Sequence, residues 1–196
     1  MEGFNLATRL NRNRLNHEKI NILVKSFKGN KSVDFVVGKS AKGREVLMEY
    51  SLENCLENGE VFISDSGKSC VLIKYSDQKS KPFKLWLWDL KLAIRGIGIL
   101  KISQVLKREA SIEAVQPKEP FLYVWFIGAE PESQGMGEGT KLLKSVLHMA
   151  NDKNLPVCLE TSTERNFKWY EDFGFSVYSS SNQFGFPFYF YRKDLL

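Results

Sequence analysis

A glycine-rich stretch in the second half of the chain could bind an anion. Residues 131–139 read Pro-Glu-Ser-Gln-Gly-Met-Gly-Glu-Gly and lie between an apolar run and an amphipathic run. Glycines at alternate positions let the backbone turn tightly and leave its N–H groups accessible. Together with the free amides at the start of a following helix, these groups would bind a phosphate or pyrophosphate. The spacing matches neither a dinucleotide-binding loop nor a Walker A loop, so a tight turn without a ligand is an equal alternative.

The sequence offers little support for a disulfide framework, a metal site or a serine nucleophile. The three cysteines are far apart and form no C-x-x-C pair, so we expect neither a disulfide framework nor a structural zinc site, and a reducing compartment fits best. The two histidines, His17 and His148, are too few for a histidine-rich metal site. No G-x-S-x-G sequence supports a serine nucleophile. We therefore expect no metal at the site.

Apolar patterns predict the elements that must position the glycine-rich stretch. We predict strands at 121–127, 155–161, 177–180 and 187–191, with a turn at 182–185. Helices are predicted between them at 137–152 and 165–173, and Gly174 would end the second. The order strand, helix, strand, helix, strand, strand predicts an α/β fold in which helices cover a mixed sheet.

The first half of the chain has a less regular pattern. We predict helices at 5–27, 43–57 and 83–110, with Gly96 and Gly98 dividing the last, and a hairpin of strands at 61–64 and 70–73. Residues 38–45 resemble a Walker A loop but lack its final Lys and Ser/Thr, so we predict a surface loop there. The aromatic residues of 83–88 could line a pocket, but packing against the sheet is the preferred interpretation.

Net charge first suggests a nucleic-acid partner, since the chain carries +5 overall. The excess lies in residues 1–50 and 81–110, which are each +5, whereas residues 111–196 are −3. We expect these basic side chains to solvate helical faces, with no nucleic-acid partner. Because the longest apolar run, 121–129, is too short to span a bilayer and the first 30 residues lack a secretory signal, we expect a cytoplasmic protein with no membrane partner.

Three motifs resemble the GNAT superfamily of acyl-CoA-dependent N-acyltransferases. The family's phosphate signature, Gln/Arg-x-x-Gly-x-Gly/Ala, is matched by Gln134, Gly137 and Gly139, and its Tyr-Glu-x-x-Gly-Phe is matched at 170–175. Residues 159–166, Leu-Glu-Thr-Ser-Thr-Glu-Arg-Asn, resemble the branch that contains puromycin N-acetyltransferase. The resemblance covers residues 119–178 and implies the GNAT fold, a mixed sheet that splays at the cofactor cleft with helices on both faces. The opening strand expected in this family is not obvious.

The resemblance implies acetyl-CoA as the cosubstrate. Its pantetheine would pair with backbone groups of Ile127 and Ala129, as an added strand would. Asn166 would hold the pantetheine side, although a helix N-cap is an equal alternative for this residue. The pyrophosphate would sit on the backbone amides of Gln134, Gly135, Met136, Gly137, Glu138 and Gly139. Thr140 would also contact the cosubstrate.

For catalysis, the resemblance implies direct acetyl transfer to an amine. Tyr170, which would also contact the cosubstrate, matches the tyrosine that protonates the departing thiolate; packing beside Trp169 is its alternative. The backbone N–H of Ala129 is the candidate oxyanion donor. Glu160, which would end a buried strand, is the first candidate for the general base, with a structural carboxylate as an equal alternative. Glu130 and a chain of water molecules are the others.

The sequence therefore predicts an N-acetyltransferase whose acceptor is a primary amine of a small molecule. A protein or peptide N-acetyltransferase and a non-catalytic acyl-CoA-binding module are the alternatives. The glutamates at 130, 160 and 164 would suit a cationic amine. We expect one domain over 1–196, in which 1–118 contributes to the acceptor site and 119–196 binds acetyl-CoA. The chain could also form a homodimer.

Overall fold

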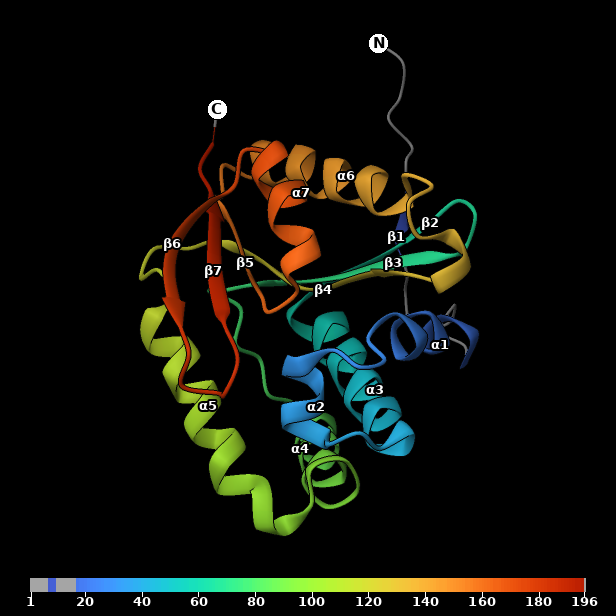
Figure 1. Ribbon diagram of the computed structural model, residues 1–196, viewed down its shortest axis with the longest axis vertical. Coiled ribbons are helices and arrows are strands. Elements are labelled where there is room, and N and C mark those ends of the chain that lie inside the picture. Colours follow the sequence, from blue (N-terminus) through green and yellow to red (C-terminus); the bar gives the residue numbers. More distant parts are fainter. Residues whose placement is uncertain (1–6, 10–16, 196) are drawn as a thin grey trace.

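One seven-stranded sheet forms the centre of the molecule (Figure 1). The computed structural model describes residues 7–9 and 17–195. The strand order is β1-β2-β3-β4-β5-β7-β6, and every neighbouring pair is antiparallel except β4 and β5. The strands are β1 (Ala7–Arg9), β2 (Gly59–Ser64), β3 (Ser69–Tyr75), β4 (Leu122–Ala129), β5 (Val157–Thr161), β6 (Ser176–Ser181) and β7 (Phe188–Lys193).

Helices cover both faces of this sheet, which confirms the predicted α/β architecture (Figure 1). One face carries α6 (Glu138–Asp152) and α7 (Phe167–Asp172). The helices on the other side are α1 (His17–Ser26), α2 (Lys31–Val37), α3 (Ala41–Asn58), α4 (Phe83–Lys91) and α5 (Ile102–Val115). None of the helices in the described part of the chain is long and apolar enough to cross a membrane.

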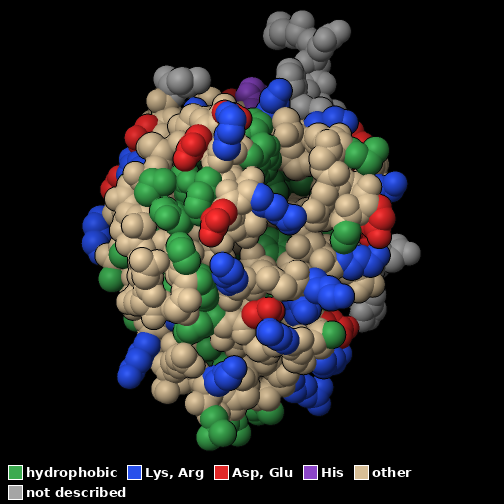
Figure 2. Space-filling view, viewed as in Figure 1, with side chains coloured by type: hydrophobic (Ala, Val, Ile, Leu, Met, Phe, Trp, Pro, Cys, Tyr) green, Lys and Arg blue, Asp and Glu red, His purple; other side chains and the backbone are tan. Residues whose placement is uncertain are grey.

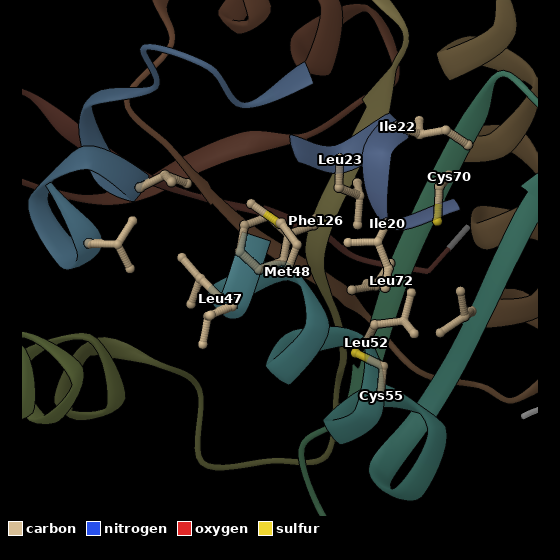
Figure 3. Close-up of a cluster of buried hydrophobic side chains, with 14 of the residues drawn as sticks. Ile20, Ile22, Leu23, Leu47, Met48, Leu52, Cys55, Cys70, Leu72 and Phe126 are labelled. Atoms are coloured by element: carbon tan, nitrogen blue, oxygen red, sulfur yellow. The ribbon is translucent and has the colours of Figure 1, made fainter. Parts of the chain in front are cut away.

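Each face has its own apolar core. On the α1–α3 side, Leu23 of α1 and Met48 and Leu52 of α3 are buried against Leu72 of β3 and Phe126 of β4 (Figure 3). The opposite core joins α6 and α7 to the other face of the same strands. Because β3 and β4 are covered on both sides, their side chains are mostly apolar on both faces, as expected of central strands.

The second half of the chain confirms the predicted elements, with small shifts at their ends. The strand predicted at 155–161 begins only at Val157, and the helix predicted at 165–173 is α7 preceded by a single turn at Glu164–Asn166. Gly174 follows α7 with φ +82°, a conformation that glycine adopts at helix ends. The predicted hairpin is also confirmed, as β2 and β3.

The first half differs from the predictions at three places. Of the helix predicted at 5–27, residues 17–26 are confirmed as α1, residues 7–9 instead form β1 because they pair with β2, far away in sequence, and residues 5–6 and 10–16 lie outside the described part of the chain. No element was predicted between 28 and 40, yet α2 lies there, with the Asn30 side chain accepting a hydrogen bond from the Val33 amide at its start. The surface loop predicted at 38–45 holds only for residues 38–40: Ser40 caps α3 by accepting from the Gly43 amide, and Arg44 is buried in the first turn of that helix.

The predicted division of the third helix at its glycines is confirmed. α4 continues as a π-helical turn at Leu92–Ile97, then Gly98 with φ +82° reverses the chain before a short turn and α5. The packing expected for the aromatic stretch holds for only one side of α4, where Leu85 is buried. Trp86 is 56% exposed and lines the cavity described below.

Candidate active site

β4 and β5 separate soon after they begin, and this separation opens the middle of the sheet. Only two residue pairs join them, Leu122 with Val157 and Tyr123 with Cys158. Beyond Tyr123, β4 keeps β3 as its neighbour while β5 pairs on with β7. Figure 1 shows the two strands diverging, and Figure 2 shows the same face of the molecule hollowed near its centre, beside α7.

The separation leaves backbone groups of β4 without a strand partner. The Glu130 amide donates to the Lys68 carbonyl at 2.9 Å, so Glu130 faces β3. Backbone groups alternate along an antiparallel pair, so those of Ile127 and Ala129 face the other side, where β5 has moved away. An extended ligand could therefore hydrogen-bond to them as a strand would.

A β-bulge shapes β4 at the same point. Leu72 of β3 pairs with Phe126 and its neighbour Ile73 pairs with Val124, so Trp125 is an extra residue. Trp125 and Phe126 consequently pack into the same core although they are adjacent, with ring centroids 5.5 Å apart. Bulges bend a strand and re-aim its side chains, and here the bend lies where the strands separate.

The glycine-rich stretch folds as an open loop that leads into α6. Gly135 has φ +80° and Gly137 has φ +81°, and a Cβ at either position would meet nothing within 4 Å. Glycine is therefore required there for backbone conformation and not for space. Gly139 lies inside α6 and has no positive φ. Within the loop, the Gln134 and Met136 amides already donate to the Pro131 and Ser133 carbonyls, whereas the amides of the first turn of α6 have no acceptor within the helix, which is the arrangement that binds anions.

Three polar side chains of the predicted phosphate segment already have protein partners. Gln134 donates through Nε2 to the Ala129 carbonyl at 3.3 Å, and Thr140 accepts from the Trp169 indole at 3.2 Å. Glu138 accepts from the Ser66 hydroxyl at 2.7 Å, and these hydroxyl hydrogen bonds lower its pKa. Met136 is 70% exposed. The loop therefore offers an anion its backbone amides more than its side chains.

A cavity of about 720 Å³ lies on the α3–α5 side of the opening, and Tyr170 lines it. The Tyr170 ring packs against Trp169, Phe175 and Tyr191. Its hydroxyl has no hydrogen-bond partner among the described residues, and burial raises its pKa, so the phenol stays protonated. Asn166 lines the same cavity and occupies the N-cap position of α7, but its side chain makes no capping hydrogen bond.

Glu160 also lines this cavity, at the end of β5. The Tyr123 hydroxyl donates to one carboxylate oxygen, and Gln116 donates to the other at 3.1 Å. Desolvation raises the pKa of Glu160 to about 7 although both hydrogen bonds act in the opposite direction. A carboxyl group with this pKa can accept a proton near neutral pH.

The other glutamates proposed for the acceptor side are placed differently. Glu130 forms an ion pair with Lys25 of α1, with 3.0 Å between Nζ and Oε1. Glu164 is exposed and does not line the cavity. Of the two candidate bases, the geometry favours Glu160.

The sequence around this site matches that of a known protein family. Residues 65–175 match the acetyltransferase (GNAT) family, and this segment includes the open edge of β4, the glycine loop and α7. The chain belongs to the GNAT family. The structure agrees, since GNAT proteins of known structure share its fold over nearly the whole chain.

Three solved structures illustrate the likeness. A histone acetyltransferase and related acetyltransferase from Corynebacterium glutamicum is 16% identical with a TM-score of 0.65, and 97% of each chain is covered. Arylalkylamine N-acetyltransferase 2 from Aedes aegypti is 13% identical with a TM-score of 0.68, covering 97% of this chain and 98% of that one. The NatC complex bound to Gag peptide and CoA is 13% identical, with a TM-score of 0.57 and the same coverage. At these identities the likeness shows the GNAT fold alone.

GNAT membership implies acetyl-CoA as the acyl donor, and the residues of this chain fit it. Ile127 and Ala129 offer backbone groups that face no neighbouring strand, the glycine loop and the start of α6 offer amides for phosphates, and Asn166 offers a side-chain amide that makes no capping hydrogen bond. The individual contacts of these residues stay predictions.

Sequence reasoning missed two residues that position Glu160. Tyr123 lies in an otherwise apolar run of residues, and only its hydroxyl group distinguishes it from the neighbouring apolar side chains. Gln116 follows α5 and lies 44 positions before Glu160 in the chain, so no local pattern connected them.

Proposed function

We propose that this GNAT protein transfers an acetyl group from acetyl-CoA to a primary amine of a small molecule. The observation that carries this proposal is that one cavity, at the opening of β4 and β5, is lined by both a potential base and a potential acid, Glu160 and Tyr170. The resemblance to the puromycin N-acetyltransferase branch supports the same class of acceptor.

The proposed reaction forms a C–N bond and breaks the C–S bond without a covalent link to the protein. Glu160 takes a proton from the amine, directly or through water, because only a neutral amine is nucleophilic. The Ala129 N–H, on the open edge of β4, donates to the carbonyl oxygen as negative charge develops there. Tyr170 gives its proton to the departing sulfur and regains one from solvent.

The size and walls of the cavity favour a small acceptor. Its volume of about 720 Å³ lies in the usual range for small-molecule sites. α5 and the β6–β7 hairpin wall one side through Ile112 and Phe188, which pack together. A peptide acceptor, as in the similar NatC structure, would need a longer groove.

The test is release of free thiol from acetyl-CoA with panels of small amines and of peptides, with mass spectrometry of the products. We expect an acetylated small amine. Turnover only with peptides would replace this proposal with peptide acetylation, and tight acetyl-CoA binding without turnover on any amine would favour the non-catalytic module.

The glycine loop supplies a separate prediction. Gly137→Ala should lower stability by about 1 kcal/mol, because alanine is strained at φ +81°, and should raise the KM for acetyl-CoA severalfold by moving the loop amides. Gly185→Ala is the matched control, since Gly185 has the same kind of positive φ, +82°, and open space around it, but lies in the turn between β6 and β7, outside the predicted phosphate segment. Thermal unfolding and the KM for acetyl-CoA measure both effects. Equal KM values in the two variants would contradict phosphate binding by this loop.

A further inference from the structure

Three neighbouring strands place a lysine, a phenol and a carboxyl group in one row. Lys74 of β3 is directly opposite Tyr123 of β4, and residues opposite each other in an antiparallel pair point to the same face. The Tyr123 hydroxyl in turn reaches Glu160 of β5. All three residues line the cavity. The row therefore runs from a cation to the proposed base along one cavity wall.

Lys74 has no counterion in the described part of the chain. Its Nζ lies 4.6 Å from the centroid of the Trp125 ring, and no carboxylate there forms an ion pair or hydrogen bond with it. Lys91, another half-buried lysine, does pair, with Glu49 at 2.6 Å. Burial lowers the pKa of Lys74, partly against the attraction of Glu109. A cation withdrawn from water without a partner is unfavourable, so its retention in a cavity points to a ligand.

The other deeply placed cation of the cavity, Arg108, is already paired with a carboxylate, although its buried Nε has no hydrogen-bond partner among the described residues. Arg108 of α5 donates to Glu109 and, at 2.5 Å, to the Ser32 hydroxyl. Its guanidinium also stacks over Phe184 and Phe188. Lys81 and Arg165 line the cavity too, but both are exposed. Lys74 is thus the enclosed cation whose three donors remain open for an acceptor molecule.

We propose that Lys74 binds an anionic group of the acceptor, so that the preferred substrate is an amine that also carries a carboxylate or a similar anion. This inference rests on the proposed acetyltransferase function and narrows its substrate class. The amine would face Glu160 while the anion faces Lys74. Glu160 lies two residues beyond Cys158, the last residue of β5 that pairs with β4, so the backbones of Lys74 and Glu160 are separated by more than two strand spacings, roughly 10 Å. This separation favours acceptors whose charged groups are several bonds apart.

The test compares acceptors that differ only in the anion. Straight-chain ω-amino acids of increasing length are paired with their amides and with the matching aminoalkyl phosphonates. For the wild type we expect kcat/KM to be about tenfold or more higher for the best acid or phosphonate than for its amide, as for other charge-paired ligands. The compound with the higher kcat/KM shows whether the site prefers a carboxylate or a phosphonate.

Variants assign this preference to Lys74. Lys74→Met should abolish the preference for the anion, measured within each protein as the ratio of kcat/KM for the acid to kcat/KM for its amide, whereas Lys74→Arg should retain the preference. Lys144→Met removes an exposed charge on α6 and is the matched control for net charge. An anion preference that survives in Lys74→Met, or a wild type that prefers amides, overturns the inference.

Calorimetric binding of the same compounds separates this inference from the proposed function. Charge-dependent binding that is lost in Lys74→Met supports the anion site even if no compound is acetylated, and in that case only the proposed reaction fails. Equal affinity of acid and amide for the wild type overturns the anion site whether or not turnover occurs.

Discussion

Replacing Tyr170 with phenylalanine should lower kcat roughly a hundredfold or more, the usual contribution of a positioned proton donor. The phenol is available because burial keeps it protonated and no described residue accepts its hydrogen bond. A raised pKa would weaken a donor to a thiolate in water. The thiolate would leave into the same cavity, where desolvation raises the pKa of its conjugate acid as well.

The Tyr170→Phe substitution should change turnover without changing the stability of the folded protein. Because the Tyr170 hydroxyl has no partner in the described structure, its removal breaks no hydrogen bond, and the melting temperature should be unchanged. Tyr178→Phe is the control, since that hydroxyl is also buried without a partner but does not line the cavity. Steady-state kinetics that show the same kcat for Tyr170→Phe and Tyr178→Phe would reject Tyr170 as the acid.

Glu160→Gln should reduce kcat/KM about a hundredfold at neutral pH, because glutamine cannot accept the proton of the amine. In the wild type, kcat/KM should rise as pH increases through about 7, where Glu160 loses its proton. This inflection should vanish in the variant. Since the acceptor amine titrates as well, both proteins are measured with the same acceptor. Glu164→Gln, an exposed carboxyl on the following turn, should leave the profile unchanged. A wild-type profile in Glu160→Gln would leave proton removal to Glu130 or to water.

The contribution of Glu160 to the stability of the folded protein should fall as pH rises, whereas its contribution to kcat/KM should increase. The folded protein holds the proton of Glu160 more tightly than the unfolded chain, since burial raises its pKa from 4.5 to about 7. The stabilisation is full below the unfolded pKa and is lost as pH rises through the folded value, on the order of 3 kcal/mol. At pH 8 the neutral glutamine variant should therefore unfold at the same temperature as the wild type or higher. Thermal melts at pH 5 and pH 8 check this, and a lower melting temperature at pH 8 would show that Glu160 is structural.

The sequence was most informative where one segment determines its own conformation. The glycine loop, the amphipathic α6 and the turn at Gly174 follow from local residue types, so residues 119–178 could be predicted well. β1 exists because it pairs with β2, and no local pattern in three residues reveals that. The signals for α2 were local, an Asn30 cap and valines at helical spacing, and were overlooked. The bulge at Trp125 and the unpaired charge of Lys74 depend on contacts between strands, so only the structure shows them.

The opening between β4 and β5 divides the proposed catalytic groups between two half-sheets. Ala129 belongs to the half formed by β1 to β4, whereas Glu160 belongs to the half formed by β5, β7 and β6. In the described structure, the two strands at this seam are joined by two residue pairs, by the hydrogen bond from the Leu122 amide to the Pro156 carbonyl and by that from Tyr123 to Glu160. The alignment of oxyanion donor and base is therefore a property of this seam. Substitutions that weaken these contacts, even at residues that touch no substrate, should lower turnover before they lower the stability of the fold. A cosubstrate that pairs with β4 as an added strand would hold the two half-sheets together from the open side.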